Sequence, residues 1–148
     1  MALSKKKNNE SKNMHFSRED QKKILSSSSP FIVKEAYSSI RTNLLFSQKG
    51  DECPVFIVTS PTANNGKSIN SVNMAVSFAQ MGKKTLLIDA DMRNPTVHRL
   101  FSIPVKNGLS EILAGLTDNI TVSKTDIENL SVLTAGKIPP NPSELLSS

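Results

Sequence analysis

The chain has 148 residues, of which 37% are hydrophobic, and a net charge of +5. This length is enough for one folded domain with a core of its own. No apolar run reaches the length of a transmembrane helix, and the start does not resemble a secretory signal. A single cysteine excludes an internal disulfide framework and is typical of a cytoplasmic protein.

Basic residues gather at the beginning of the chain: Lys5, Lys6, Lys7, Lys12, Arg18, Lys22 and Lys23. Such a tail is typical of a solvated or membrane-proximal segment. With one tyrosine and no tryptophan, surfaces for stacking bases are scarce, so no nucleic-acid partner is expected. A serine run at 26–29 follows, and then Pro30. Residues 1–30 are therefore predicted to be a disordered arm, and 31–148 to be the folded domain.

The first periodic segment is 31–47. Apolar residues recur every four positions, with others widening the stripe, which predicts an amphipathic helix. The stripe contains Ile32, Ala36, Ile40 and Leu44, widened by Val33, Tyr37 and Leu45.

A short apolar run at 55–58 predicts a buried strand, and the polar loop after it leads through Gly66, Lys67 and Ser68 into a helical pattern. Strand, loop, GK[ST] and helix is the layout of a phosphate-binding P-loop. Backbone N–H groups of the loop and the helix N-terminus would bind phosphate oxygens. Lys67 would contact the β- and γ-phosphates, and the Ser68 hydroxyl would bind Mg²⁺.

The loop differs from the usual GxxxxGK[ST] pattern. Pro61 stands where the first glycine is expected, and Asn64 and Asn65 fill the loop interior. Asparagine tolerates left-handed backbone angles, so these two residues are compatible with a nucleotide-binding loop. The alternative for this stretch is a plain surface turn between a strand and a helix.

After the P-loop, apolar spacing predicts a helix that ends near Gly82. The run at 85–88 has no alternating polar residue, which predicts a parallel strand buried on both faces and a right-handed βαβ unit. A short helix over 109–113 and a third strand over 130–133 follow, whereas the prolines of 138–142 exclude regular structure. These elements predict an α/β fold, a P-loop NTPase-type parallel sheet flanked by helices.

Two carboxylates follow the second strand. Asp89 and Asp91 are at the carboxyl end, where open α/β sheets bind ligands, and positions i and i+2 of extended backbone face the same side. They could hold Mg²⁺ or accept a proton from an attacking hydroxyl. Arg93 would be a further cation for phosphates. The alternatives are that the aspartates merely end the strand and that Arg93 forms an ion pair with one of them.

With the P-loop, TLLIDADMRNPTVHRLF (85–101), NGLSEILAG (107–115) and NLSVLTAGKIPPNPSELL (129–146) in view, the chain resembles a known family over roughly 33–148. It is similar to the bacterial tyrosine kinases (BY-kinases) of capsular and exopolysaccharide synthesis. These are cytoplasmic ATP-binding partners of a membrane chain-length regulator. The resemblance implies an ATP- and Mg²⁺-dependent protein-tyrosine kinase at the inner face of the cell membrane.

The resemblance also implies residue roles. Gly66, Lys67 and Ser68 match the Walker A motif, and Asp89 and Asp91 match the Walker A′ motif that handles Mg²⁺ and catalysis. Glu35 and Arg41 match the ends of the E-x-x-R-x-x-R helix motif that builds ring-shaped homo-oligomers, with Ser38 in place of the middle arginine.

Family members continue beyond PNPSELL into a Walker B strand and a tyrosine-rich tail, which this sequence lacks. We therefore expect only the N-terminal part of the fold, exposed apolar strand edges and weak or no kinase activity. One alternative is a non-catalytic nucleotide-binding subunit of a membrane polysaccharide complex. Another is a partitioning-type P-loop ATPase, although such proteins carry a signature lysine where this chain has Thr62.

Overall fold

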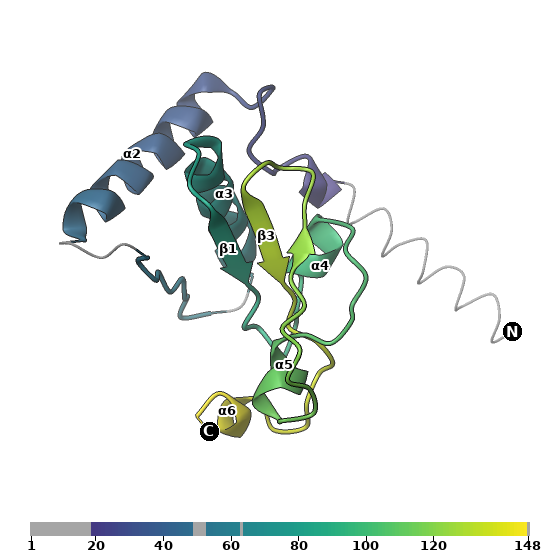
Figure 1. Ribbon diagram of the computed structural model, residues 1–148. Coiled ribbons are helices and arrows are strands. Elements are labelled where there is room, and N and C mark those ends of the chain that lie inside the picture. The colour runs from purple at the N-terminus through teal and green to yellow at the C-terminus, as the bar shows by residue number, and fades with distance from the viewer. Residues whose placement is uncertain (1–18, 49–52, 63, 148) are drawn as a thin grey trace, which may run out of the picture.

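The computed structural model describes residues 19–48, 53–62 and 64–147 (Figure 1). Its helices are α2 (Phe31–Ser47), α3 (Lys67–Gln80), α4 (Val97–Leu100), α5 (Leu109–Leu113) and α6 (Pro142–Leu145). Its strands are β1 (Thr85–Ile88), β2 (Ser123–Lys124) and β3 (Leu130–Leu133). The predictions of helices at 31–47 and 109–113 and of strands at 85–88 and 130–133 are confirmed.

The three strands form one sheet in the order β1-β3-β2. β1 and β3 run parallel, with Thr85 opposite Leu130 and Ile88 opposite Leu133. The two-residue β2 pairs antiparallel with β3. The fold is therefore α/β as predicted, but the sheet is mixed and parallel only in its β1–β3 pair.

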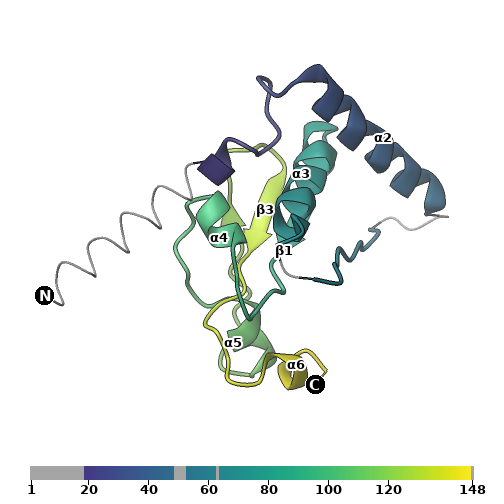
Figure 2. The same ribbon diagram turned by 180° about the vertical axis from the view of Figure 1, so that it is seen from behind.

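The extended stretch at 55–58, predicted to be a strand, has no strand partner in the described part of the chain. Figures 1 and 2 place it on the side of β1 away from β3. The ring of Phe56 stacks on Phe78 of α3 with centroids 5.6 Å apart, whereas Val55 and Ile57 are 82% and 89% exposed. The strand prediction and the βαβ unit built on it are wrong, because a strand needs a neighbouring backbone and apolar spacing cannot supply one.

Residues 19–30 differ from the predicted disordered arm. Leu25 is buried in the core, and its backbone N–H donates to Asn73 Oδ1 at 2.8 Å. Asn73 Nδ2 in turn donates to the carbonyl oxygen of Lys23 at 3.0 Å. One buried leucine and two hydrogen bonds therefore fasten this segment to α3, while 1–18 lie outside the described residues.

Helix α2 packs on α3 with only part of its predicted apolar stripe. None of its residues is buried, and Ile32 and Ile40 of the predicted apolar stripe are 75% and 45% exposed. The side facing α3 carries Tyr37 and Arg41, which make polar contacts with that helix. The helix prediction is confirmed; of its apolar stripe, Tyr37 contacts α3, whereas Ile32 and Ile40 are exposed.

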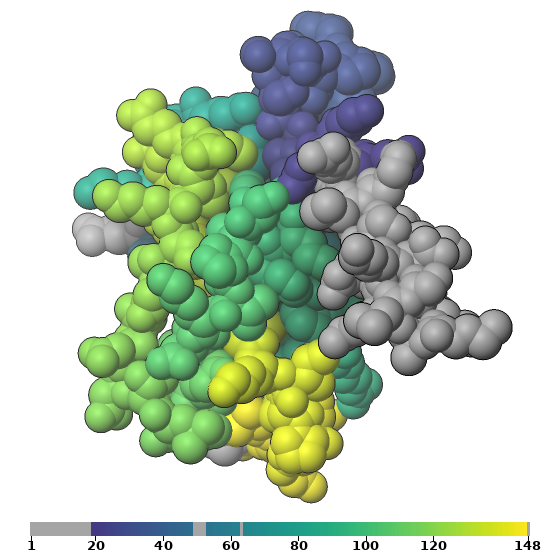
Figure 3. Space-filling model, turned by 90° about the vertical axis from the view of Figure 1, so that its right-hand side faces the viewer, coloured from purple at the N-terminus to yellow at the C-terminus, as the bar shows by residue number. Residues whose placement is uncertain are grey.

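The C-terminal segment lies on the surface beside the segment that contains α5, as Figure 3 shows in yellow and green. The backbone N–H of Lys137 donates to Glu111 Oε1 of α5 at 3.1 Å. Pro142 begins α6, so the prediction of no regular structure over 138–142 is wrong at its last residue, because proline is tolerated where the first helical N–H has no partner. Among the described helices, none is long and apolar enough to cross a bilayer.

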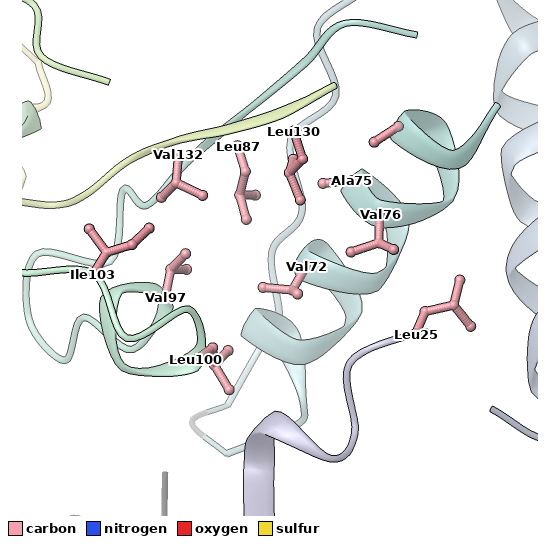
Figure 4. Close-up of a cluster of buried hydrophobic side chains, with 11 residues drawn as sticks. Leu25, Val72, Ala75, Val76, Leu87, Val97, Leu100, Ile103, Leu130 and Val132 are labelled. Atoms are coloured by element: carbon pink, nitrogen blue, oxygen red, sulfur yellow. The ribbon is translucent and has the colours of Figure 1, made fainter. Parts of the chain in front are cut away.

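The core lies between the sheet and helices α3 and α4 (Figure 4). Leu87 and Val132 point from the sheet toward Val72 and Val76 of α3 and Leu100 of α4. Leu86 and Ile88 of β1 point the other way and are 50% and 47% exposed. The prediction that 85–88 is buried on both faces is wrong, because the described helices cover one face of the sheet.

Helix α3 ends as its glycine predicts. The N–H of Gly82 donates to Ala79 O at 2.9 Å, and the N–H of Lys83 donates to Phe78 O at 3.2 Å. These two bonds form a Schellman motif, in which Gly82 has a φ of 82°. The turn brings the chain from the end of α3 into β1.

Candidate nucleotide site

The loop before α3 has the backbone geometry of an anion site. Gly66, the N-cap of α3, has a φ of 72°, and no side chain caps the helix. The first-turn N–H groups of α3 have no partner within the helix and can therefore bind an anion. Asn64 also has a left-handed φ of 62°, and Asn65 Nδ2 donates to Thr62 Oγ1 at 2.7 Å. The two asparagines thus shape the loop in different ways, Asn64 by its left-handed backbone and Asn65 by its side-chain hydrogen bond.

Lys67 and Asp91 lie together although they are 24 positions apart in sequence. Lys67 Nζ is 2.8 Å from Asp91 Oδ2, and their side chains are 33% and 25% exposed. Asp91 Oδ1 accepts a hydrogen bond from the N–H of Asn94 at 3.0 Å. Burial alone raises the pKa of Asp91, but the Lys67 ammonium and this N–H outweigh it, so the pKa is below its ordinary value. Asp91 is therefore negatively charged at neutral pH.

Asp89 has a different environment from Asp91. It is only 5% exposed, and its Oδ1 accepts the N–H of Asp91 at 3.1 Å. Its Oδ2 accepts the N–H groups of Thr96 at 3.2 Å and Val97 at 3.1 Å, at the start of α4. Burial raises the pKa of Asp89, and these three N–H groups oppose the rise without cancelling it. Asp89 thus braces the loop between β1 and α4 on the inner side of Asp91.

Arg93 does not pair with either aspartate. It is exposed, and its Nη2 donates to Ser143 Oγ of α6 at 2.8 Å. This contact connects the loop after β1 with the PNPSELL segment, a connection that sequence reasoning missed. The only sequence signal was that both blocks belong to one family pattern.

The residues present fit a Mg²⁺–nucleotide. The Ser68 hydroxyl has no hydrogen bond to another described residue, and Asp91 is partly open to solvent. No group of three or more His, Cys, Asp or Glu side chains that could hold a metal occurs in the described ranges. The Ser68 hydroxyl and the Asp91 carboxylate suit Mg²⁺, because protein sites bind this ion through one or two carboxylates together with phosphates and water.

Glu35 and Arg41 of α2 lie outside this site. Glu35 is exposed, whereas Arg41 Nη1 donates to Ser77 O at 2.8 Å and Ser77 Oγ at 2.9 Å on α3. Arg41 Nη2 also donates to Ser38 Oγ at 3.0 Å, at the position where the family motif has its middle arginine. The Arg41 guanidinium thus forms its hydrogen bonds within this chain, to Ser77 and Ser38.

The arrangement defines the class of the protein: an α/β P-loop fold in which a carboxylate from the loop after β1 contacts the P-loop lysine. No family model matches the sequence. The chain is 46% identical over 117 residues to a "Putative tyrosine-protein kinase CapB" of Staphylococcus aureus, covering 78% of this chain and 51% of that protein. It is 42% identical over 130 residues to "Tyrosine-protein kinase YwqD" of Bacillus subtilis, covering 86% of this chain and 55% of that protein.

Solved structures are also similar to this chain. The "BceF Tyrosine Kinase Domain" matches with a TM-score of 0.74 and 42% identity, over 84% of this chain and 50% of that one. The "chimerical protein CapA2B2" matches with a TM-score of 0.70 and 43% identity, over 82% of this chain and 53% of that one. The chain is thus homologous to the BY-kinase family over about four fifths of its length, and it spans about half the length of CapB and of YwqD.

Proposed function

We propose that this chain binds ATP with Mg²⁺ and takes part in protein-tyrosine phosphorylation that regulates capsular or exopolysaccharide synthesis. The observation that carries the proposal is the Lys67–Asp91 contact of 2.8 Å. It joins a P-loop cation to a carboxylate suited to Mg²⁺, the two charges that phosphoryl transfer requires side by side. Homology to CapB and YwqD supports the choice of tyrosine kinase among P-loop activities.

The residues have distinct roles in this proposal. Backbone N–H groups at Asn64, Asn65 and Gly66 bind phosphate oxygens, and Lys67 binds the phosphates as a cation. The nucleotide, when bound, supplies the γ-phosphoryl group.

Beside Lys67, Ser68 and Asp91 would hold Mg²⁺. Asp89 holds Asp91 in place and, with its raised pKa, is the candidate for accepting the tyrosine hydroxyl proton. Arg93 contributes positive charge at the rim.

Incubation with labelled ATP, Mg²⁺ and a tyrosine-rich peptide tests the kinase. We expect transfer to tyrosine that is lost in Lys67→Ala and Asp89→Ala. Unchanged phosphoryl transfer in both variants would contradict the mechanism. Lys124 is exposed and remote from the site, so Lys124→Ala is the control for the loss of one positive charge.

A non-catalytic role in a membrane polysaccharide complex is the second candidate. It is favoured by the three backbone N–H groups that occupy the Asp89 carboxylate and compete with a role as proton acceptor. Calorimetry with ADP and Mg²⁺, together with the kinase assay above, distinguishes the two candidates. Binding without phosphoryl transfer would support the second, and transfer would exclude it.

We further propose that the chain works at the inner face of the cell membrane, beside a transmembrane chain-length regulator and as a homo-oligomer. Helix α2 supports an interface, because Ile32, Ile40 and Phe46 are 75%, 45% and 82% exposed next to the exposed Glu35. Arg41 would contribute by holding α2 on α3. Light scattering of the wild type and of Glu35→Ala tests the oligomer; identical masses would contradict a role for Glu35.

A further inference from the structure

The hydroxyl of Tyr37, on α2, makes two hydrogen bonds to α3. It donates to Asn70 Oδ1 at 2.8 Å and accepts from Asn73 Nδ2 at 3.2 Å. Because no residue of α2 is buried, such polar contacts have a large share in docking this helix. Tyr37 is therefore one of few residues that hold α2 on the rest of the molecule.

The amide of Asn70 continues from Tyr37 to the P-loop. Asn70 Nδ2 donates to Gly66 O at 3.0 Å, and the Asn70 backbone N–H donates to the same oxygen at 2.9 Å. Gly66 is the left-handed residue immediately before Lys67. Two side-chain hydrogen bonds thus connect the Tyr37 hydroxyl on α2 with the loop that is proposed to bind phosphate.

The chemistry of the three groups determines the direction of these bonds. A carbonyl oxygen can only accept, so the NH₂ group of Asn70 must face Gly66 and its oxygen must face Tyr37. The tyrosine then donates to this oxygen and accepts from Asn73, which is 3% exposed and is fixed by Lys23 O and Leu25 N. Each polar atom of the two amides has a partner, and the arrangement admits one orientation of Asn70.

We propose that Tyr37 is a positioning residue for the nucleotide loop and that docking of α2 and occupancy of the P-loop stabilise each other through Asn70. This inference rests on the proposed nucleotide binding at Lys67 and Ser68. Coupling between two sites is reciprocal. A partner that holds α2 in its docked position therefore tightens nucleotide binding, and one that pulls α2 away weakens it.

The chain carries its own optical probe for this coupling, because it has one tyrosine and no tryptophan. Intrinsic fluorescence therefore reports on Tyr37 alone. We expect ADP with Mg²⁺ to change the tyrosine emission with the same Kd that calorimetry gives. Binding without any emission change would count against the coupling.

Substitution provides the second test. Tyr37→Phe keeps the ring and removes the hydroxyl, and we expect it to raise the Kd for ADP–Mg²⁺ about fivefold, the effect of one ordinary hydrogen bond. Asn70→Ala should weaken binding similarly, and the double variant should be no weaker than the Asn70→Ala single variant, because both changes interrupt one path. Additive losses, or an unchanged Kd in Tyr37→Phe, would overturn the inference.

A nucleotide-free measurement completes the design. Amide hydrogen exchange of residues 64–69 should be faster in Tyr37→Phe than in the wild type. Ser47→Ala is the matched control, because it removes a hydroxyl of α2 whose partner among the described residues is Leu44 O in the same helix. It should leave both exchange and Kd unchanged. If the wild type did not bind ADP, the proposed function and this inference would both be refuted. If the wild type bound ADP but the Tyr37→Phe and Asn70→Ala variants had the same Kd and the same exchange rates, this inference alone would be refuted.

Discussion

Asp89 and Asp91 are two residues apart, yet their pKa values are shifted in opposite directions. Burial raises that of Asp89, and the Lys67 ammonium holds that of Asp91 low. Asp91 thus remains the charged partner of Lys67 at neutral pH, while Asp89 is the group that holds a proton more readily. Opposed pKa values in neighbouring carboxylates are a known means of dividing metal binding and proton transfer between them.

Asp91→Asn should change how Mg²⁺ affects nucleotide binding. Without Mg²⁺, Lys67 no longer has to leave a carboxylate to meet a phosphate, so ADP affinity should rise by up to about fivefold, the strength of a partly exposed ion pair. With Mg²⁺, the gain in affinity that the metal gives the wild type should be lost. Titration calorimetry with ADP in Mg²⁺ and in EDTA measures both effects. Asp118→Asn, at an exposed site, makes the same charge change and should behave as the wild type.

Glu111 is a buried carboxylate, 6% exposed, that holds α5 to the loop after β3. Burial raises its pKa, but hydrogen bonds from the N–H groups of Gly108 and Lys137 and from the Ser110 hydroxyl outweigh this, and the pKa is lowered. A lowered carboxyl pKa gives stability that is complete above the unfolded value and is lost as the pH falls through the folded one.

Glu111→Gln should therefore cost about 1–3 kcal/mol of unfolding free energy at pH 7, because a buried N–H loses its charged acceptor. The variant should also lose less stability than the wild type between pH 7 and pH 3. Urea denaturation at the two pH values measures this difference. Parallel pH dependence in both proteins would show that Glu111 does not titrate with folding.

Helix α5 depends on a close approach of two backbones. A Cβ on Gly108 would lie 2.4 Å from both Gly136 N and Thr134 O, which leaves no room for a side chain. The same stretch makes hydrogen bonds from Leu109 N to Thr134 O and from Ser110 N to Ala135 O, each 2.9 Å. The short helix is thus held at the end of β3 by backbone contacts that require glycine.

Gly108→Ala should destabilise the protein by at least about 1–3 kcal/mol, because α5 must move away and lose those hydrogen bonds. Thermal and urea denaturation measure the loss. Asn107→Ala, the exposed neighbour in the same turn, should change stability by no more than about 0.5 kcal/mol. Equal stability of the two variants would contradict the close packing.

The whole molecule leaves apolar surface uncovered on one side. Leu86 and Ile88 of β1 are about half exposed, and Val55 and Ile57 of the neighbouring extended stretch are more than four fifths exposed. The edge of β1 opposite β3 has no partner strand among the described residues. Unpaired, apolar strand edges associate with other chains.

Self-association through this surface should be concentration-dependent and should weaken when charge is added. Ile57→Lys should lower the average mass at high protein concentration, because a lysine on an extended edge opposes pairing. Asn119→Lys adds the same charge at an exposed polar site and is the control. Multi-angle light scattering over a concentration series, with circular dichroism to verify folding, distinguishes them. Equal masses would exclude this edge as the contact.

The amino-acid sequence by itself determined most of the local structure and predicted a phosphate-binding loop. Helix 31–47, the glycine-terminated helix after the P-loop and strands 85–88 and 130–133 all follow from apolar spacing and turn residues, which depend on neighbours in the chain. The GKS motif and the aspartates after the second strand predicted the two parts of the candidate site, and the folded chain brings Lys67 and Asp91 together.

The tertiary structure decided which backbones and faces meet. Residues 55–58 remain unpaired, the arm at 19–30 packs through Leu25, and α2 turns Tyr37 and Arg41 rather than Ile32 and Ile40 toward α3. Strand pairing and burial depend on partners far away in sequence, which periodicity does not specify. For the same reason the Tyr37–Asn70–Gly66 connection is visible only in the folded chain, where residues 33 positions apart share a hydrogen bond.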